Sequence, residues 1–208
     1  MRAFIAATAI LGIAAIGLPL SGNVEGVVLW NEQPVPGAHV YATSEYSFQS
    51  IHYGDARADA DGHFTIRNVP PGQKYLYAFG TGREYWVSAV TPFTMPPDAG
   101  VVAPPIYLCK GFDASSPARD AIVTTKRPTL AWPSYPTAVD YAVRVLRDGE
   151  RSFIFSRGDR DGHVTATSVA VDIDLPNGSY NWRVDAFNRA GHIIGCSFYP
   201  RPFLVRTG

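Results

Sequence analysis

The sequence has no excess of charge of either sign. It contains 18 Lys or Arg and 18 Asp or Glu among 208 residues, which gives a formal net charge of +0 at pH 7. The basic residues are spread along the chain and form no cluster. Proteins that bind nucleic acid present a positive patch to the phosphate backbone, so the sequence predicts no nucleic-acid partner.

Common catalytic and metal-binding motifs are also missing. The sequence contains no H-E-x-x-H helix, no G-x-S-x-G elbow and no P-loop. The histidines are scattered, without the close spacing of metal ligands, at His39, His52, His63, His163 and His192. We therefore predict a non-catalytic protein with no metal and no cofactor. The alternative is a hydrolase of unfamiliar type, with a Ser-His-Asp site assembled in space.

Long apolar runs are missing, with one exception at the N-terminus. Arg2 is followed by an uninterrupted apolar run, Ala3–Leu18, and then by Pro19 and Gly22. This is the layout of a secretory signal peptide, to which we assign residues 1–22. The run lies at the lower edge of what can span a bilayer, so an uncleaved anchor is the alternative, and a membrane is a partner only in that case. We expect a secreted, periplasmic or cell-surface protein.

Residues that favour turns and strands are abundant. There are 19 Gly and 17 Pro, scattered rather than repeated, together with many Val, Thr, Tyr and Phe. This composition is typical of all-β structure rather than disorder. The chain after the signal segment is long enough for two small domains.

The clearest strand and turn signals lie in residues 59–79. Asp61-Gly62 suits a two-residue hairpin, because Gly accepts positive φ and Asp can hydrogen-bond its own backbone. Phe64 and Ile66 then alternate with polar residues, which predicts a strand with one buried face.

The proline-rich segment Val69–Gly72 should end this strand, because consecutive prolines supply no ladder donors. The next strand buries Tyr75, Tyr77 and Phe79 or their alternates. Together with Q-P-V-P-G-A-H-V at residues 33–40, this pattern resembles the carboxypeptidase regulatory-like domain. The resemblance implies a transthyretin-like (prealbumin-like) β-sandwich over residues 23–110, in a domain that is normally an appendage rather than a catalyst.

A second strand pattern fills the last part of the chain. Leu130 and Trp132 share one face, residues 141–145 alternate in the same way, and residues 175–186 combine an Asn-Gly turn with strict alternation. These stretches resemble a fibronectin type III domain, an immunoglobulin-like sandwich, over residues 111–208. The predicted fold is therefore all-β, with two tandem antiparallel β-sandwiches after the signal segment.

This second resemblance implies roles for three aromatic residues. Trp132 would fill the core, and Tyr180 matches the tyrosine corner, whose hydroxyl bonds back to the backbone at a turn. Trp182 alternates with Tyr180, which favours packing in the core over stacking against a sugar.

The only cysteines are Cys109 and Cys196, in a chain that we expect in an oxidising compartment. The fibronectin-like resemblance implies that Cys196 directly follows the loop between the last two strands, residues 188–195, and that this loop lies at the same pole as the start of that domain. We therefore hypothesise an interdomain disulfide, Cys109 to Cys196, with two free buried thiols as the alternative. Such a bond would contribute about 4 to 5 kcal/mol in the chain-entropy model.

One short phrase occurs twice, as D-A-D-G-H at residues 59–63 and as D-R-D-G-H at residues 159–163. Paired carboxylates before Gly are reminiscent of calcium loops. An EF-hand needs a bidentate Glu at its twelfth position, where this chain has Pro70 and Ala170. We therefore interpret both phrases as hairpin turns and predict no metal site.

The best candidates for a binding surface are aromatic residues on loops. Tyr46, Phe48 and Tyr53 lie in a long connection of the first domain, and Tyr85 and Trp86 follow a Gly-rich turn. Rings on the loops of a rigid sandwich suit stacking on sugars or burial in a protein interface. The alternative is that they cover the edge of the sandwich or the junction between domains.

We therefore predict a secreted or cell-envelope accessory module that recognises carbohydrate or an envelope protein. The competing prediction is a structural scaffold or assembly component of the cell surface, with no small-molecule ligand.

Overall fold

The computed structural model describes residues 21–45, 51–81, 85–87, 90–97, 99–158, 162, 164–197 and 201–208, and gives the backbone for 85–87. Every regular element within these ranges is a strand. The strands enclose two separate hydrophobic cores. The predicted all-β class is confirmed. Within the same ranges there is no helix long and apolar enough to cross a membrane. The predicted signal segment lies almost wholly outside the described residues and stays a prediction.

The first core is enclosed by two sheets that face each other. One sheet has the order β4-β3-β6-β8, and the other is built around β1, which pairs with β2, β5, β9 and β10. The strands of this half are β1 (Gly22–Trp30), β2 (Gln33–Pro34), β3 (His39–Thr43), β4 (His52–Arg57), β5 (His63–Val69), β6 (Gly72–Phe79), β7 (Tyr85–Val87), β8 (Thr91–Met95), β9 (Val101–Val102) and β10 (Ile106–Phe112).

Side-chain alternation decides which residues enter this core. In β5, Phe64 and Ile66 are only 3% and 1% exposed, as their spacing predicts. In β6, Leu76 and Ala78 are fully buried and belong to the core cluster. The rings of β6 therefore stand on the other face of the sheet. The prolines after Val69 separate β5 from β6, as predicted.

The first core also contains a charged side chain. Lys74 is 6% exposed, and its Nζ donates to the carbonyl oxygens of Pro71 at 2.9 Å and Gln73 at 3.2 Å. The same Nζ lies 5.0 Å from the centre of the Tyr53 ring. Burial lowers the pKa of Lys74, because an ammonium group loses its hydration there. A buried ammonium group therefore lies beside the apolar side chains of this sandwich.

The second core is enclosed by the remaining strands. They are β11 (Ala121–Val123), β12 (Thr129–Ala131), β13 (Asp140–Arg147), β14 (Phe153–Arg157), β15 (Ser168–Ala170), β16 (Gly178–Phe187), β17 (Ile193–Ser197) and β18 (Arg201–Val205). Trp132 and Trp182 are 3% and 1% exposed, so both fill the core as predicted. The Tyr180 hydroxyl donates to the carbonyl oxygen of Pro176 at 2.7 Å, which is the predicted tyrosine-corner bond.

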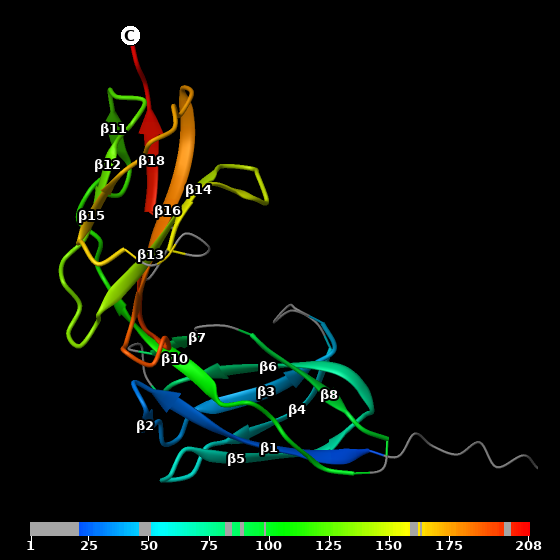
Figure 1. The fold of residues 1–208 in the computed structure, drawn as a ribbon. Coiled ribbons are helices and arrows are strands. Elements are labelled where there is room, and N and C mark those ends of the chain that lie inside the picture. The colour runs from blue at the N-terminus through cyan, green and yellow to red at the C-terminus, as the bar shows by residue number, and fades with distance from the viewer. Residues whose placement is uncertain are drawn as a thin grey trace, which may run out of the picture.

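A single strand, β10, runs from one sandwich into the other (Figure 1). Its first residues pair with β1, and Lys110 to Phe112 pair with β17. The predicted boundary between residues 110 and 111 falls inside this strand. Cys109 and Cys196 form a disulfide with a Cα–Cα distance of 5.8 Å, so the two sandwiches are also covalently joined.

Two details of the predicted architecture are wrong. The loop expected over residues 188–195 is shorter than predicted, because the strand β17 already begins at Ile193. The sheets are not purely antiparallel, because β1 runs parallel to β9 and β10, β10 to β17, and β11 to β18. Each parallel pair joins strands far apart in the sequence, which allows the long connection that parallel pairing requires.

Candidate binding surfaces

The structure describes only some of the five predicted binding residues, and it places those in strands. Tyr46 and Phe48 lie outside the described residues. Tyr85 and Trp86 lie in the strand β7 rather than in the predicted loop, opposite Lys110 and Cys109 of β10, and their side chains lie outside the described part. Tyr53 lies in β4 rather than in a connection, and it packs against the first core, where it faces the buried lysine. The prediction that Tyr53 is a loop residue is therefore wrong, because the strand begins one residue earlier.

Other aromatic side chains gather on the face of β3 and β6 that points away from the first core, which we call the aromatic face; Tyr77 on this face is itself buried, with 7% exposed. In the register of these strands, His39 lies opposite Phe79, and Tyr41 lies opposite Tyr77. Tyr75 lies further along the same face of β6. The inner residues between them, such as Val40 and Leu76, belong to the core. Alternation in H-V-Y-A-T and Y-L-Y-A-F is the sequence signal that could have identified this surface.

Polar groups on the aromatic face form one chain of hydrogen bonds. His39 Nε2 lies 2.5 Å from Asp55 Oδ2, and Tyr41 Oη lies 2.7 Å from His39 Nδ1. A carboxylate accepts hydrogen bonds, so Nε2–H donates to Asp55 and Nδ1 of the neutral ring accepts from the Tyr41 hydroxyl. The side chains of His39 and Asp55 are 28% and 56% exposed, so a ligand can reach this chain.

Tyr41 is the centre of a group of rings on this face. Its ring centre lies 4.2 Å from that of His39, 5.3 Å from that of His52, and 6.1 Å from that of Phe79 in an edge-on arrangement. These distances are in the range of aromatic pairs that stabilise one another. The rings therefore hold the Tyr41 hydroxyl and the His39 imidazole in defined positions.

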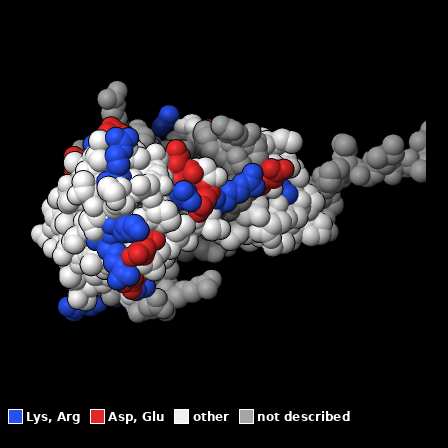
Figure 2. All heavy atoms as spheres, turned by 90° about the horizontal axis from the view of Figure 1, so that it is seen from above, with Lys and Arg blue, Asp and Glu red and all other residues white. Residues whose placement is uncertain are grey.

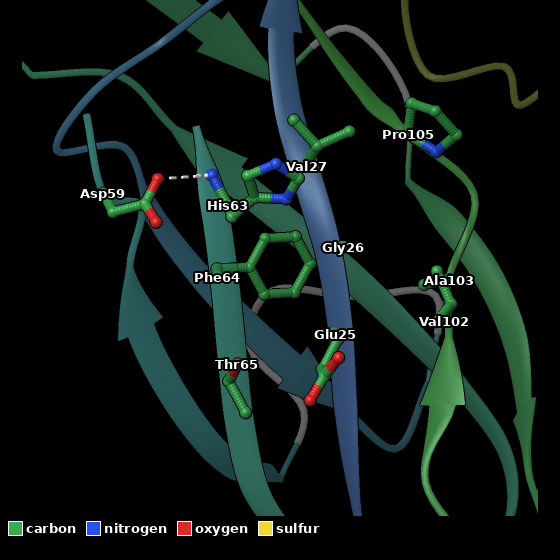
Figure 3. A pocket seen from close by; sticks show the side chains of 10 residues that line it. All are labelled: Glu25, Gly26, Val27, Asp59, His63, Phe64, Thr65, Val102, Ala103 and Pro105. Carbon is green, nitrogen blue, oxygen red and sulfur yellow. Dashed lines mark hydrogen bonds between the residues drawn. The ribbon is translucent and has the colours of Figure 1, made fainter. Parts of the chain in front are cut away.

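A hollow of about 560 Å³ opens beside β1 (Figure 3). Pro104 and Pro105 supply no backbone N–H, and the chain leaves β1 between its pairing with β9 and its pairing with β10. The phenyl ring of Phe64 points at Gly26, where a Cβ would come within 2.7 Å of it. Glycine is therefore required at position 26 for this packing.

The rim of the hollow includes polar side chains, among them the Asp59 carboxylate. Asp59 Oδ1 accepts from the backbone N–H groups of Asp61 and His63, both at 2.9 Å. Figure 3 shows the bond to His63. The carboxylate that closes this turn is thus Asp59 rather than the predicted Asp61. Within the described ranges no group of three His, Cys, Asp or Glu side chains could hold a metal ion. In the second D-x-D-G-H phrase, Gly162 alone is described.

The two sandwiches meet at a cluster of polar side chains, which we call the junction clasp. Glu32 Oε1 accepts from Asn188 Nδ2 at 3.0 Å and lies 2.6 Å from His192 Nδ1. These hydrogen bonds lower the pKa of Glu32, because they stabilise its ionised form. Asn31 accepts from Asn188 Nδ2 at 3.2 Å and donates to Thr137 at 3.2 Å. The tip of the β1–β2 hairpin is therefore bound by the second sandwich.

Aromatic contacts add to the junction clasp. The rings of Tyr107 and His192 are stacked, with centres 3.7 Å apart. Trp30 Nε1 donates to the carbonyl oxygen of Ile194 at 2.7 Å, and Lys110 Nζ lies 4.1 Å from the centre of the Trp30 ring. With the disulfide and the β10–β17 pairing, these contacts fix one sandwich relative to the other.

Charged side chains of the second sandwich largely pair with one another. Asp185 is 1% exposed and accepts from Arg144 and, at 2.6 Å, from Arg183. On the face shown in Figure 2, acidic and basic side chains lie side by side rather than in large areas of one sign. That face offers no basic surface of the kind that binds a polyanion.

Comparison with known proteins adds little to this description. No protein-family model matches the sequence, and no curated protein matches it. Among solved structures, the chain is similar to a DUF3823 family protein from Parabacteroides merdae, with 12% identity, a TM-score of 0.33, and coverage of 90% of this chain and 99% of that one. It is also similar to the FN1–FN3 domains of chicken CNTN1, with 13% identity, a TM-score of 0.35, and coverage of 91% and 68%.

A third similar structure is BcpA, the major pilin subunit of Bacillus cereus, with 13% identity, a TM-score of 0.36, and coverage of 90% and 70%. Likenesses with such low TM-scores carry no argument about what the chain binds.

Proposed function

We propose that this protein is a non-catalytic, secreted or cell-envelope accessory module that binds carbohydrate through the aromatic face. The observation that supports this most is the Asp55–His39–Tyr41 chain of hydrogen bonds set among aromatic rings. Ring faces suit the apolar C–H faces of a sugar, and the carboxylate, imidazole and hydroxyl suit its hydroxyl groups.

The predicted loop residues extend this proposal. Tyr46 and Phe48 lie in the chain between β3 and β4, and Tyr85 and Trp86 follow β6. The strands that carry the aromatic face are thus continued by aromatic segments. We propose that these segments and the aromatic face form one binding surface, with an envelope protein as the other class of ligand.

A glycan array followed by calorimetric titration tests the proposal. His39→Gln and Tyr41→Phe each break the hydrogen-bond chain with little change in shape, so each should weaken glycan binding about tenfold, equivalent to about 1.4 kcal/mol. Trp86→Ala tests the segment that follows β6 in the same titration. Phe153→Ala is the matched control, because Phe153 is an exposed ring, 51% accessible, on the second sandwich. Absence of glycan binding, or an equal loss in the control, would overturn the proposal.

The junction supports a second candidate function, that of a rigid spacer or scaffold component of the cell surface. A disulfide, a shared strand and the junction clasp hold the two sandwiches together. A spacer needs this stiffness, whereas a surface for a single ligand does not. A defined oligomer by light scattering, together with no binding on the array, would favour this role.

A further inference from the structure

A second concave site lies at the junction itself. It is a cleft of about 430 Å³ with walls from both sandwiches. The residues that line it are Val90, Thr91, Pro92, Pro104, Pro105, Tyr107, Phe187, Gly191, His192 and Ile193. Clefts between domains are frequent sites for small ligands.

The walls of this cleft are held rigid from several directions. Proline rings form part of the first-sandwich side, and their backbone φ angles are fixed. On the other side, His192 is held by its hydrogen bond to Glu32 and by its stack on Tyr107. The Cys109–Cys196 disulfide prevents the two walls from separating. The cleft therefore exists before a ligand arrives, which lowers the entropic cost of binding.

The polar groups that the described residues bring to the cleft are few. None of its described lining residues is Asp, Glu, Lys or Arg. His192 Nδ1 faces the Glu32 carboxylate, so Nδ1 carries the proton and Nε2 of the neutral ring is an acceptor. Within the described part of the chain, His192 Nε2 and the hydroxyls of Tyr107 and Thr91 have no hydrogen-bond partner.

We propose that the junction cleft binds one uncharged sugar residue. The flat faces of the prolines and of Tyr107 suit the C–H face of a pyranose ring. A sugar hydroxyl can donate to His192 Nε2, while the Tyr107 and Thr91 hydroxyls can donate to other sugar oxygens. An anionic or cationic sugar would find no side chain of opposite charge among the described residues that line the cleft.

A titration followed by NMR tests this site in the purified full chain. The probes are the methyl glycosides of glucose, galactose and mannose, and N-acetylglucosamine, with glucuronic acid as the charged counterpart. At least one neutral probe should shift the His192 imidazole signals at concentrations of about 50 mM, well above the millimolar Kd of a weak single-sugar site. Glucuronic acid should leave them unchanged.

Two conservative variants separate a binding role from a structural one. Tyr107→Phe keeps the stack on His192 and Thr91→Val keeps the shape of the side chain, so both should fold and should weaken the neutral probe about fivefold. Tyr41→Phe on the aromatic face should leave the His192 titration unchanged, which distinguishes failure at one site from failure at the other. The proposal would be overturned if no neutral probe shifted the His192 signals. It would also be overturned if Tyr107→Phe and Thr91→Val both bound the neutral probe as tightly as the wild-type protein does.

Discussion

Two turns of this protein have the same backbone and opposite surroundings. Residues 59–63 read D-A-D-G-H, and residues 188–192 read N-R-A-G-H. In each turn the first side chain accepts from the backbone N–H groups two and four residues later, at 2.9 and 2.9 Å in the first and 3.0 and 2.9 Å in the second. The glycines also agree, with φ of 77° at Gly62 and 79° at Gly191. One five-residue pattern thus specifies one turn in both sandwiches.

The two turns differ in what the rest of the first side chain can do. Asn188 is 6% exposed, and its amide group donates to Glu32 and Asn31 across the junction. Asp59 stands on the open rim of the hollow and has a second carboxylate oxygen, which can only accept. An amide holds the neighbouring sandwich where a carboxylate would repel Glu32. The shared backbone pattern determines the turn. Whether the first side chain carries an amide nitrogen or a second carboxylate oxygen determines whether the turn can bind the neighbouring sandwich.

Of the changes considered, loss of the disulfide should reduce stability the most, because the disulfide holds together the two sandwiches between which the junction turn lies. Cys109 and Cys196 are separated by 87 positions, and a crosslink over such a distance contributes about 4 to 5 kcal/mol in the chain-entropy model. The double variant Cys109→Ala, Cys196→Ala should lose about that much stability in urea unfolding. An unchanged unfolding midpoint would show that the β10–β17 pairing and the junction clasp hold the sandwiches without the bond.

Truncation of the first residue of each turn should separate the two turns directly. Asn188→Ala removes two turn hydrogen bonds and also leaves Glu32 and Asn31 without their amide partner, so we expect a loss of about 2 to 3 kcal/mol. Asp59→Ala removes the turn hydrogen bonds at an exposed site, and about 1 kcal/mol is expected. Urea unfolding of both variants measures the difference, and equal losses would contradict the importance of the junction contact.

Local patterns allowed much of the fold to be predicted from the sequence. Alternation placed Phe64, Trp132 and Trp182 in the cores, and the tyrosine-corner resemblance identified the bond of Tyr180. These features depend on neighbours within a few residues or on the burial of one face. The turn is closed by the carboxylate of Asp59 rather than that of Asp61. Asp59 stands at the start of the turn, and its carboxylate accepts from the backbone N–H groups of Asp61 and His63, which follow it in the chain.

The surfaces were harder to predict, because they depend on pairs distant in the sequence. The Asp55–His39–Tyr41 chain requires the register of β3 with β4, and alternation by itself does not give that register. The junction clasp joins Glu32 to residues more than 150 positions away. Tyr53 was expected on a loop, because no turn residue marks where β4 begins.

Acid should weaken the junction turn through Glu32. The pKa of Glu32 lies below its ordinary value of 4.5, so the clasp stabilises the protein fully above that pH and loses its contribution as pH falls through the lowered pKa. Glu32 is 44% exposed at its side chain, and the contribution should be about 1 kcal/mol or less. The stability difference between wild type and Glu32→Ala should therefore shrink on acidification. A difference that stays constant from neutral pH to pH well below 4.5 would contradict this role.

Exchange of the Asp59 carboxylate for an amide should have the smallest effect on stability. It directly tests the comparison between the turns at residues 59–63 and 188–192. Asp59→Asn keeps the Oδ1 acceptor of the turn and replaces the second carboxylate oxygen by an amide group like that of Asn188. The free energy of unfolding should therefore change by about 0.5 kcal/mol or less. The amide signals of Asp61 and His63 should stay in place in NMR spectra. The reciprocal control, Asn188→Asp, brings a second carboxylate against Glu32. It should lower the free energy of unfolding by more than Asp59→Asn does. If Asp59→Asn disrupts its turn as strongly as Asn188→Asp disrupts the junction, the first side chain does more in the hollow than accept two backbone hydrogen bonds.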